Sequence, residues 1–87
     1  MRASRLIGWN LRRLRVAAGL SQETLAVDAN VDRSYVGRLE RSTVNAGVDV
    51  LEKIAGALGC KVADFFREPS ADEPEPKPLR GGRKPRS

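Results

Sequence analysis

The chain has 87 residues, with 16 Lys plus Arg, 11 Asp plus Glu, no His and a single Cys. This length holds one small domain, and without His there is no imidazole base, no Ser-His or Cys-His dyad and no His-ligated metal. Cys60 alone forms neither an intrachain disulfide nor a Cys-rich zinc site. No apolar run reaches membrane-spanning length, and the amino terminus lacks a signal-type stretch. We therefore expect a cytoplasmic protein that is not an enzyme and uses no metal, cofactor or membrane.

Apolar residues recur at spacings of three and four, which predicts an all-α domain. The first helix contains Ile7, Leu11 and Leu14 and stops at Gly19, because glycine readily adopts the left-handed conformation that ends a helix. A second helix begins at Ser21, whose hydroxyl can accept a bond from a first-turn N–H. It closes at Asn30, a residue that tolerates positive φ.

Three more helices are predicted after that turn. Asp32 caps a third helix that runs to about Arg41, a fourth covers residues 48–58 before Gly59, and a short fifth covers residues 62–66. The five helices would form a compact bundle. Its inward residues are predicted to be Ile7, Leu11, Leu14, Ala18, Leu25, Ala26, Ala29, Val31, Val36, Leu39, Val48, Leu51, Ile54, Ala55, Leu58, Val62, Phe65 and Phe66.

Composition changes sharply near the end of the chain. All five prolines follow Phe66, where large apolar residues nearly vanish, so the fold is predicted to cover residues 1–67 and a disordered, Pro-rich tail residues 68–87. Residues 21–66 carry five basic and seven acidic side chains. The folded part is therefore not a nonspecific polycation, and any affinity for a polyanion depends on where individual Arg side chains point.

Residues 22–41 read as two short helices joined by a tight turn, with the small Ala26 where the helices approach and Val31 in the corner. Two stretches carry a recognisable pattern, Gly19-Leu20-Ser21-Gln22-Glu23-Thr24-Leu25-Ala26 and Asp32-Arg33-Ser34-Tyr35-Val36-Gly37-Arg38-Leu39-Glu40-Arg41. They resemble the helix-turn-helix of the phage repressor and Cro-like (XRE) family. The resemblance implies a five-helix, repressor-like DNA-binding domain whose third helix enters the major groove.

The helical wheel of the third helix supplies candidate groove residues without the family. With Val36 and Leu39 inward, the side facing away contains Ser34, Gly37, Arg38 and Arg41, and Arg33 lies at its flank. The resemblance makes Arg33, Ser34 and Arg38 the base-reading set, and an Arg fork matches O6 and N7 of guanine. Gly37 costs about 1 kcal/mol against Ala in a helix, which close approach to DNA would explain. The alternative for each Arg is a solvated helix face.

Other residues are candidates for contacts with the DNA backbone. Gln22 stands at the start of the second helix, where the family reaches DNA and where free N–H groups can bind a phosphate; it is otherwise a solvated first-turn residue. Tyr35 either donates its hydroxyl to a phosphate or braces the turn. Arg41 is a weaker phosphate candidate, as are Arg12 and Arg13.

Arg15 and Glu40 call for a structural interpretation. Each lies about 70 degrees from the apolar stripe of its helix, so the two could meet at the edge of the core. The resemblance implies that they form a salt bridge between the first helix and the end of the third.

Some positions depart from the family pattern. The family usually has Gly where Asn30 and Ser42 stand, and basic residues where Thr43 and Val44 stand. The second change removes expected phosphate contacts. The fourth helix also begins with a weaker cap than usual at Gly47.

Two features remain outside this pattern. Trp9 falls opposite the apolar stripe of the first helix, so it either marks a partner surface or packs against the tail or the last helix. The tail has four basic residues in its last seven; it either reaches a minor groove or serves as a solubilising tail, and it is also a candidate site for a protein partner.

The leading hypothesis is a sequence-specific transcriptional regulator that binds the two halves of a palindromic double-stranded DNA operator as a homodimer, with dimer contacts implied around the fourth and fifth helices. One alternative is the DNA-binding antitoxin of a toxin-antitoxin pair. Another is a protein-interaction module that kept the fold and lost DNA binding, which Thr43 and Val44 favour and the outward Arg residues oppose.

Overall fold

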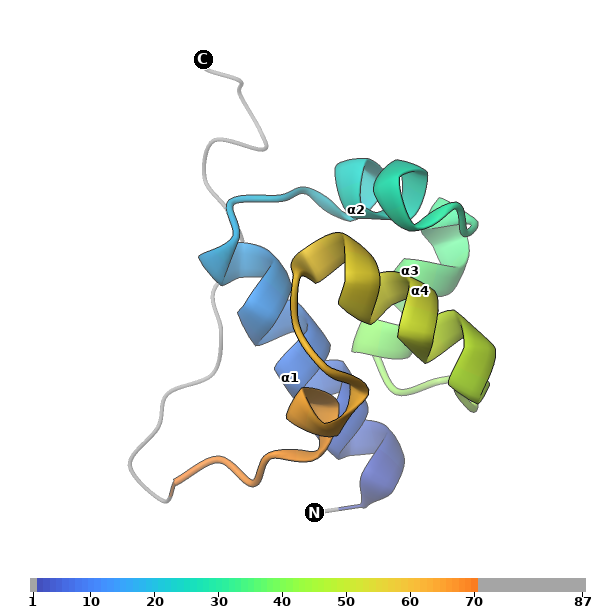
Figure 1. Ribbon diagram of the computed structural model, residues 1–87. Coiled ribbons are helices and arrows are strands. Elements are labelled where there is room, and N and C mark those ends of the chain that lie inside the picture. The colour runs from blue at the N-terminus through green and yellow to red at the C-terminus, as the bar shows by residue number, and fades with distance from the viewer. Residues whose placement is uncertain (1, 71–87) are drawn as a thin grey trace.

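The computed structural model describes residues 2–70, and over this range the chain is entirely helical apart from its turns and loops. Four α-helices are followed by a 3-10 helix, in the order α1 (Ala3–Ala17), α2 (Gln22–Ala29), α3 (Arg33–Glu40), α4 (Val48–Leu58) and η1 (Val62–Phe66). Helix α4 lies across the bundle in front of α3, and η1 packs beside α1 (Figure 1). The all-α prediction is confirmed, with the fifth element a 3-10 helix. The predicted tail falls largely in residues 71–87, which lie outside the described residues.

The residues predicted to begin and end helices do so. The Ser21 hydroxyl accepts a bond from the Thr24 N–H at 3.0 Å, and Asp32 caps α3. Asn30 closes α2 at φ 58°, and Gly59 closes α4 at φ 72°. Gly47 caps α4 without a side-chain bond, as its lack of a side chain predicted.

The core contains most of the predicted inward residues. Its buried members are Ile7, Leu11, Leu25, Ala26, Ala29, Val36, Leu39, Leu51, Ile54, Ala55 and Phe65. The prediction was wrong for Ala18, Val48 and Phe66, which are exposed, Val48 at 66% and Phe66 at 44%. All three stand at or just beyond a helix end, where no neighbouring helix covers them. Periodicity gives the direction of a residue but not how far the partner element extends.

Gly8 sets how closely α1 approaches the end of α3. A Cβ at this position would lie 2.7 Å from the Leu39 carbonyl oxygen, 2.8 Å from the Glu40 carbonyl oxygen and 2.9 Å from the Ser42 Oγ. These distances are shorter than any real contact, so only glycine permits this packing. The chain reverses just after α3 at Ser42, which has φ 62° and donates its hydroxyl to the Ser4 carbonyl at 3.1 Å.

A fully buried amide holds the end of the fold against α1. Asn10 Nδ2 donates to the carbonyl oxygens of Phe65 at 2.9 Å and Arg67 at 2.8 Å, and its Oδ1 accepts from Arg13 Nε at 3.3 Å. Buried polar groups need such partners. Asn10 therefore fixes η1 and the following residue in place, a role that sequence periodicity did not reveal.

No helix within residues 2–70 is both long and apolar enough to cross a membrane. The same residues contain no cluster of three or more His, Cys, Asp or Glu side chains arranged to hold a metal ion.

Candidate nucleic-acid interface

Helix α3 begins with a well-formed cap that also orients Ser34. The Ser34 backbone N–H donates to Asp32 Oδ1 at 3.4 Å and its hydroxyl to Asp32 Oδ2 at 2.7 Å. These bonds from Ser34 are the main reason that the pKa of Asp32 falls below its usual 3.8, with Arg38 adding a smaller Coulombic effect. Because the Ser34 hydroxyl spends its hydrogen on Asp32, its lone pairs face solvent as acceptors.

The outward face of α3 presents three exposed polar residues, Arg33, Ser34 and Arg38. The Arg38 guanidinium carbon lies 6.0 Å from the centre of the Tyr35 ring, at the outer limit of a cation–π contact. The structure therefore gathers the three sequence-predicted base readers on one surface. No described acidic residue pairs with Arg33 or Arg38.

Gly37 lies on the same side of α3 but is covered rather than open. A Cβ there would lie 3.3 Å from Arg41 Nη1 and 3.5 Å from Gln22 Oε1. The side chains of Gln22 and Arg41 therefore lie over the helix where glycine leaves room for them. This gives the glycine a role in packing two polar side chains that the sequence interpretation had assigned separately to DNA.

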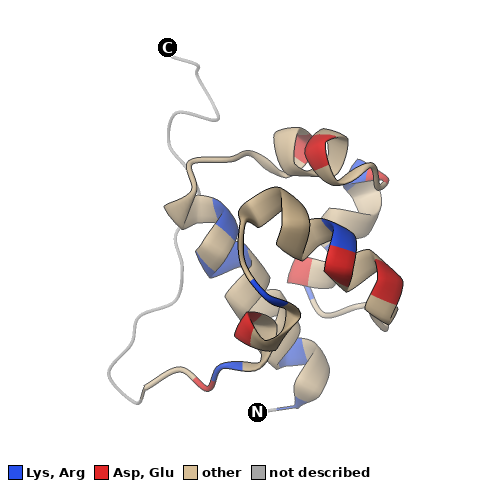
Figure 2. Cartoon of the chain, in the orientation of Figure 1, with Lys and Arg blue, Asp and Glu red and all other residues tan. Residues whose placement is uncertain are grey.

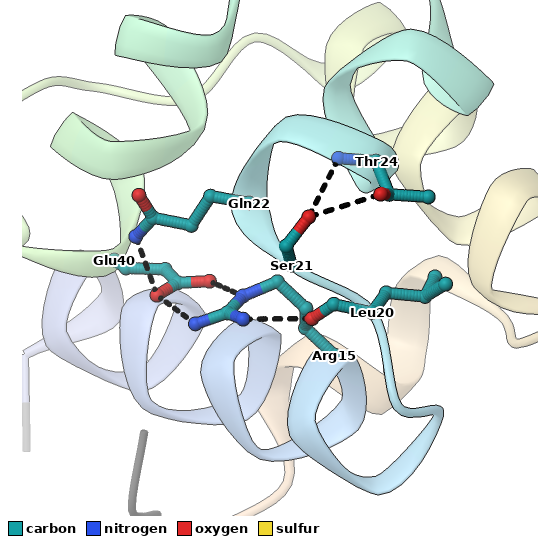
Figure 3. A network of polar contacts seen from close by, with 6 residues as sticks. All are labelled: Arg15, Leu20, Ser21, Gln22, Thr24 and Glu40. Carbon is teal, nitrogen blue, oxygen red and sulfur yellow. Dashed lines mark hydrogen bonds and ion pairs between the residues drawn. The ribbon is translucent and has the colours of Figure 1, made fainter. Parts of the chain in front are cut away.

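Gln22 belongs to a polar network that joins three helices (Figure 3). Arg15 Nε donates to Glu40 Oε2 at 2.6 Å, and Arg15 Nη2 and Gln22 Nε2 both donate to Glu40 Oε1 at 3.0 Å. Arg15 Nη1 also donates to the Leu20 carbonyl at 2.8 Å. The two charged side chains are only 7% and 4% exposed. The ion pair implied by the resemblance is thus present, and it fixes the start of α2 against the end of α3.

The loop after α3 is held by side chains rather than by basic residues. The Tyr35 hydroxyl donates to the Asn45 carbonyl at 3.1 Å, so it braces the loop in this structure. The Thr43 hydroxyl donates to the Arg38 carbonyl at 3.2 Å, and Val44 packs against the core. Both departures from the family pattern, Thr43 and Val44, therefore have a folding role.

Charge is divided among the helices. The sequence of α1 has four arginines and no acidic residue, whereas α2 contains Glu23 and Asp28 and α4 contains Asp49 and Glu52. Figure 2 shows this separation, with basic residues along α1 and acidic residues on α2 and α4. Trp9, on α1, is half-buried and lies near the end of α3. A surface that meets a polyanion is therefore expected to combine α3 with α1 rather than with α4.

This arrangement of α2, a tight turn and an exposed α3 defines the class of helix-turn-helix DNA-binding proteins. The helix-turn-helix family matches residues 11–65, which is most of the described fold. The chain belongs to this family, in its phage repressor and Cro-like (XRE) branch, whose members are DNA-binding transcriptional regulators.

Several relatives support this membership. The chain is 38% identical over 62 residues to the control protein C.BamHI of Bacillus amyloliquefaciens, covering 70% of this chain and 76% of the relative. It is 43% identical over 64 residues to a hypothetical transcription factor of Neisseria meningitidis, covering 74% of this chain and 60% of that protein.

Two solved structures share the fold. The restriction-modification controller protein C.AhdI of Aeromonas hydrophila is 44% identical, with a TM-score of 0.70, and the match covers 72% of this chain and 96% of that one. The controller protein C.Esp1396I, solved as a tetramer with its 35 base-pair operator, is 29% identical with a TM-score of 0.69, over 76% of this chain and 87% of that one.

Proposed function

We propose that this chain is a sequence-specific regulator that works in the cytoplasm, inserting α3 into the major groove of a palindromic operator as a homodimer. The observation that carries the proposal is the exposed face of α3, where Arg33, Ser34 and Arg38 stand together without acidic partners among the described residues. A helix fits the major groove, and a guanidinium can make two parallel bonds to guanine.

Each of the three residues has a distinct role in this proposal. Arg38, in the last turn of α3, and Arg33, in its first turn, donate to guanine O6 and N7. Ser34 offers an oriented acceptor, because its hydroxyl hydrogen is held by Asp32. It would accept from the amino group of adenine or cytosine.

The residues beside this face are assigned to the DNA backbone. Gln22 and Arg41 cover Gly37 at the edge of the α3 surface, and Arg41 is exposed. Phosphate contacts of this kind position the helix but carry no sequence information. Tyr35 can join them only by exchanging its bond to the Asn45 carbonyl for one to a phosphate oxygen.

Dimer formation is supported by relatives and by apolar exposure. C.Esp1396I is a tetramer on its operator, and two half-sites one helical turn apart require a two-fold symmetric protein. Val48 on α4 and Phe66 on η1 are exposed apolar residues in the region where dimer contacts are expected. Sedimentation equilibrium of wild type and Phe66→Ser tests this part, and a wild-type monomer bound to DNA would contradict it.

The experiment that tests sequence reading is selection of bound duplexes from a random pool at physiological salt, followed by titration of variants. Arg38→Ala should cost about 1–3 kcal/mol and relax the preference at one base pair per half-site. Lys53→Ala is the matched control, because it also removes one exposed positive charge but lies on α4. Equal weakening on all sequences would make Arg38 a phosphate contact, and no sequence preference in wild type would reject the proposal.

A further inference from the structure

A pocket of about 420 Å³ lies between the first half of α1 and the end of α3, outside the surface assigned to base reading. Arg5, Trp9 and Arg12 share one face of α1 at helical spacings of four and three residues. The end of α3 and the next two residues close the other side. The lining side chains other than Gly8 are Arg5, Trp9, Arg12, Glu40, Arg41 and Ser42.

The pocket is positively charged, and its charges are not used within the described fold. Glu40 is the acidic residue in its lining, but both of its oxygens already accept bonds from Arg15 and Gln22. Arg5, Arg12 and Arg41 form no ion pair with any described residue. Three guanidinium groups therefore converge on one pocket without a partner for their charge.

Two buried hydrogen-bond donors in the same pocket also have no acceptor. Trp9 Nε1 and Arg12 Nε are covered, and neither donates to any atom of residues 2–70. A buried donor left unpaired is costly, and native structures contain few of them. An anion with several oxygens, reached by small rotations of these two side chains, would satisfy both donors and the three charges together.

We infer that this pocket binds a phosphate group of the DNA backbone, at the side of the major groove that faces α1. The inference rests on the proposed function and extends it. Arg41 lines the pocket and also covers Gly37 on the α3 face, so the pocket continues directly from the proposed recognition surface. When α3 occupies the groove, the phosphates that border the groove pass this end of the helix.

The test compares phosphate contacts rather than base preference. Ethylation interference on a selected operator should identify one phosphate per half-site that wild type needs and Arg5→Gln/Arg12→Gln does not. The double variant should keep the same base preference, and its slope of log affinity against log salt should be shallower by about one per lost contact. Raising salt fourfold should then weaken the variant about threefold less than wild type.

Two single variants complete the design. Arg13→Gln removes a charge from the same helix at a residue that bonds Asn10 and does not line the pocket, so it should retain the phosphate contact. Trp9→Phe keeps an aromatic ring but removes the indole N–H, and it should weaken binding equally on all sequences. Circular dichroism melts confirm that each variant is folded before it is compared.

The outcomes separate the two proposals. If wild type and the double variant need the same phosphates and share one salt slope, the pocket assignment is wrong while sequence reading by α3 stands. If wild type binds no duplex, both are wrong. Trp9 is the only tryptophan, so its fluorescence reports directly on inorganic phosphate. A fluorescence change that the double variant loses, together with unchanged DNA contacts, would assign the pocket to a small anion and overturn the DNA source.

Discussion

Replacing Glu40 with Ala should destabilise the fold by about 3–5 kcal/mol, because it leaves the charge of Arg15 buried without its partner. Arg15 is only 6% exposed, and the substitution removes both of its bonds to the carboxylate. Its bond to the Leu20 carbonyl remains but carries no compensating charge. Gln22 loses its acceptor as well.

The size of this loss can be compared with the total stability. At roughly 0.05–0.15 kcal/mol per residue, a domain of about 70 residues is stable by roughly 3–10 kcal/mol. A loss of 1 kcal/mol lowers the Tm of such a domain by about 4–8 °C. Glu40→Ala should therefore lower the Tm by more than about 12 °C, or unfold the domain at 25 °C.

Thermal and urea denaturation, followed by circular dichroism at neutral pH, measure the effect. The double variant Arg15→Met/Glu40→Leu removes the charge pair and fills the space with apolar side chains, so it should be much closer to wild type than Glu40→Ala is. A Tm of Glu40→Ala within about 2 °C of wild type would show that the ion pair is structurally neutral. It would also refute the account of Glu40 as the residue that fixes α2 against α3.

Three further substitutions test the packing and the caps. Gly8→Ala should destabilise by at least about 1–3 kcal/mol, because the new Cβ meets carbonyl oxygens of α3, while Gly56→Ala, with no heavy atom within 4 Å, should stabilise by about 0.5–1 kcal/mol; urea denaturation measures both, and equal effects would contradict the close approach. Asn10→Ala should cost about 1–3 kcal/mol and accelerate hydrogen exchange in η1, whose carbonyl at Phe65 loses its donor; unchanged exchange there would contradict the anchoring role. Asp32→Ala should lower the Tm at neutral pH, and since the pKa of Asp32 is lowered from 3.8 by bonds from Ser34, the difference from wild type should shrink as the pH falls below about 4; a difference that is constant down to pH 2 would refute this.

Local signals predicted the helices because each boundary depends on residues that act within one turn. Ser21 and Asp32 begin helices by bonding to N–H groups two or three residues away. Asn30 ends one through its own backbone conformation. Such effects can be inferred from sequence without knowing the partner helices, and the apolar spacing then gives the buried face of each helix.

Gly8 and Asn10 escaped prediction because their roles depend on distant segments. Nothing near Gly8 in the sequence indicates that the carbonyl oxygens of Leu39 and Glu40 will lie against it. Asn10 looks like a polar residue on an apolar face until η1 supplies the carbonyls it binds, 55 and 57 residues later. Both positions record how α1 meets another element, which helical periodicity does not specify.

The candidate site was only partly accessible from sequence for the same reason. The wheel of α3 places Arg33, Ser34 and Arg38 on one surface, and the structure has them there. It does not show that Arg41 and Gln22 fold over Gly37, because that depends on where α2 starts relative to α3. The pocket on α1 is still further from sequence reasoning, since it exists only because Gly8 lets the two helices meet.

The Arg15–Glu40 pair links the stability of the fold to the shape of the proposed DNA surface. An exposed pair of this kind would contribute little, but this one is buried, and its carboxylate also holds the Gln22 amide. Gln22 in turn lies over Gly37 beside Arg41. A hydrophobic pair could hold α1 against α3 equally well, yet it would offer Gln22 no acceptor. The value of the charged pair is therefore positional, because it fixes a polar side chain at the edge of the helix that is proposed to enter the groove.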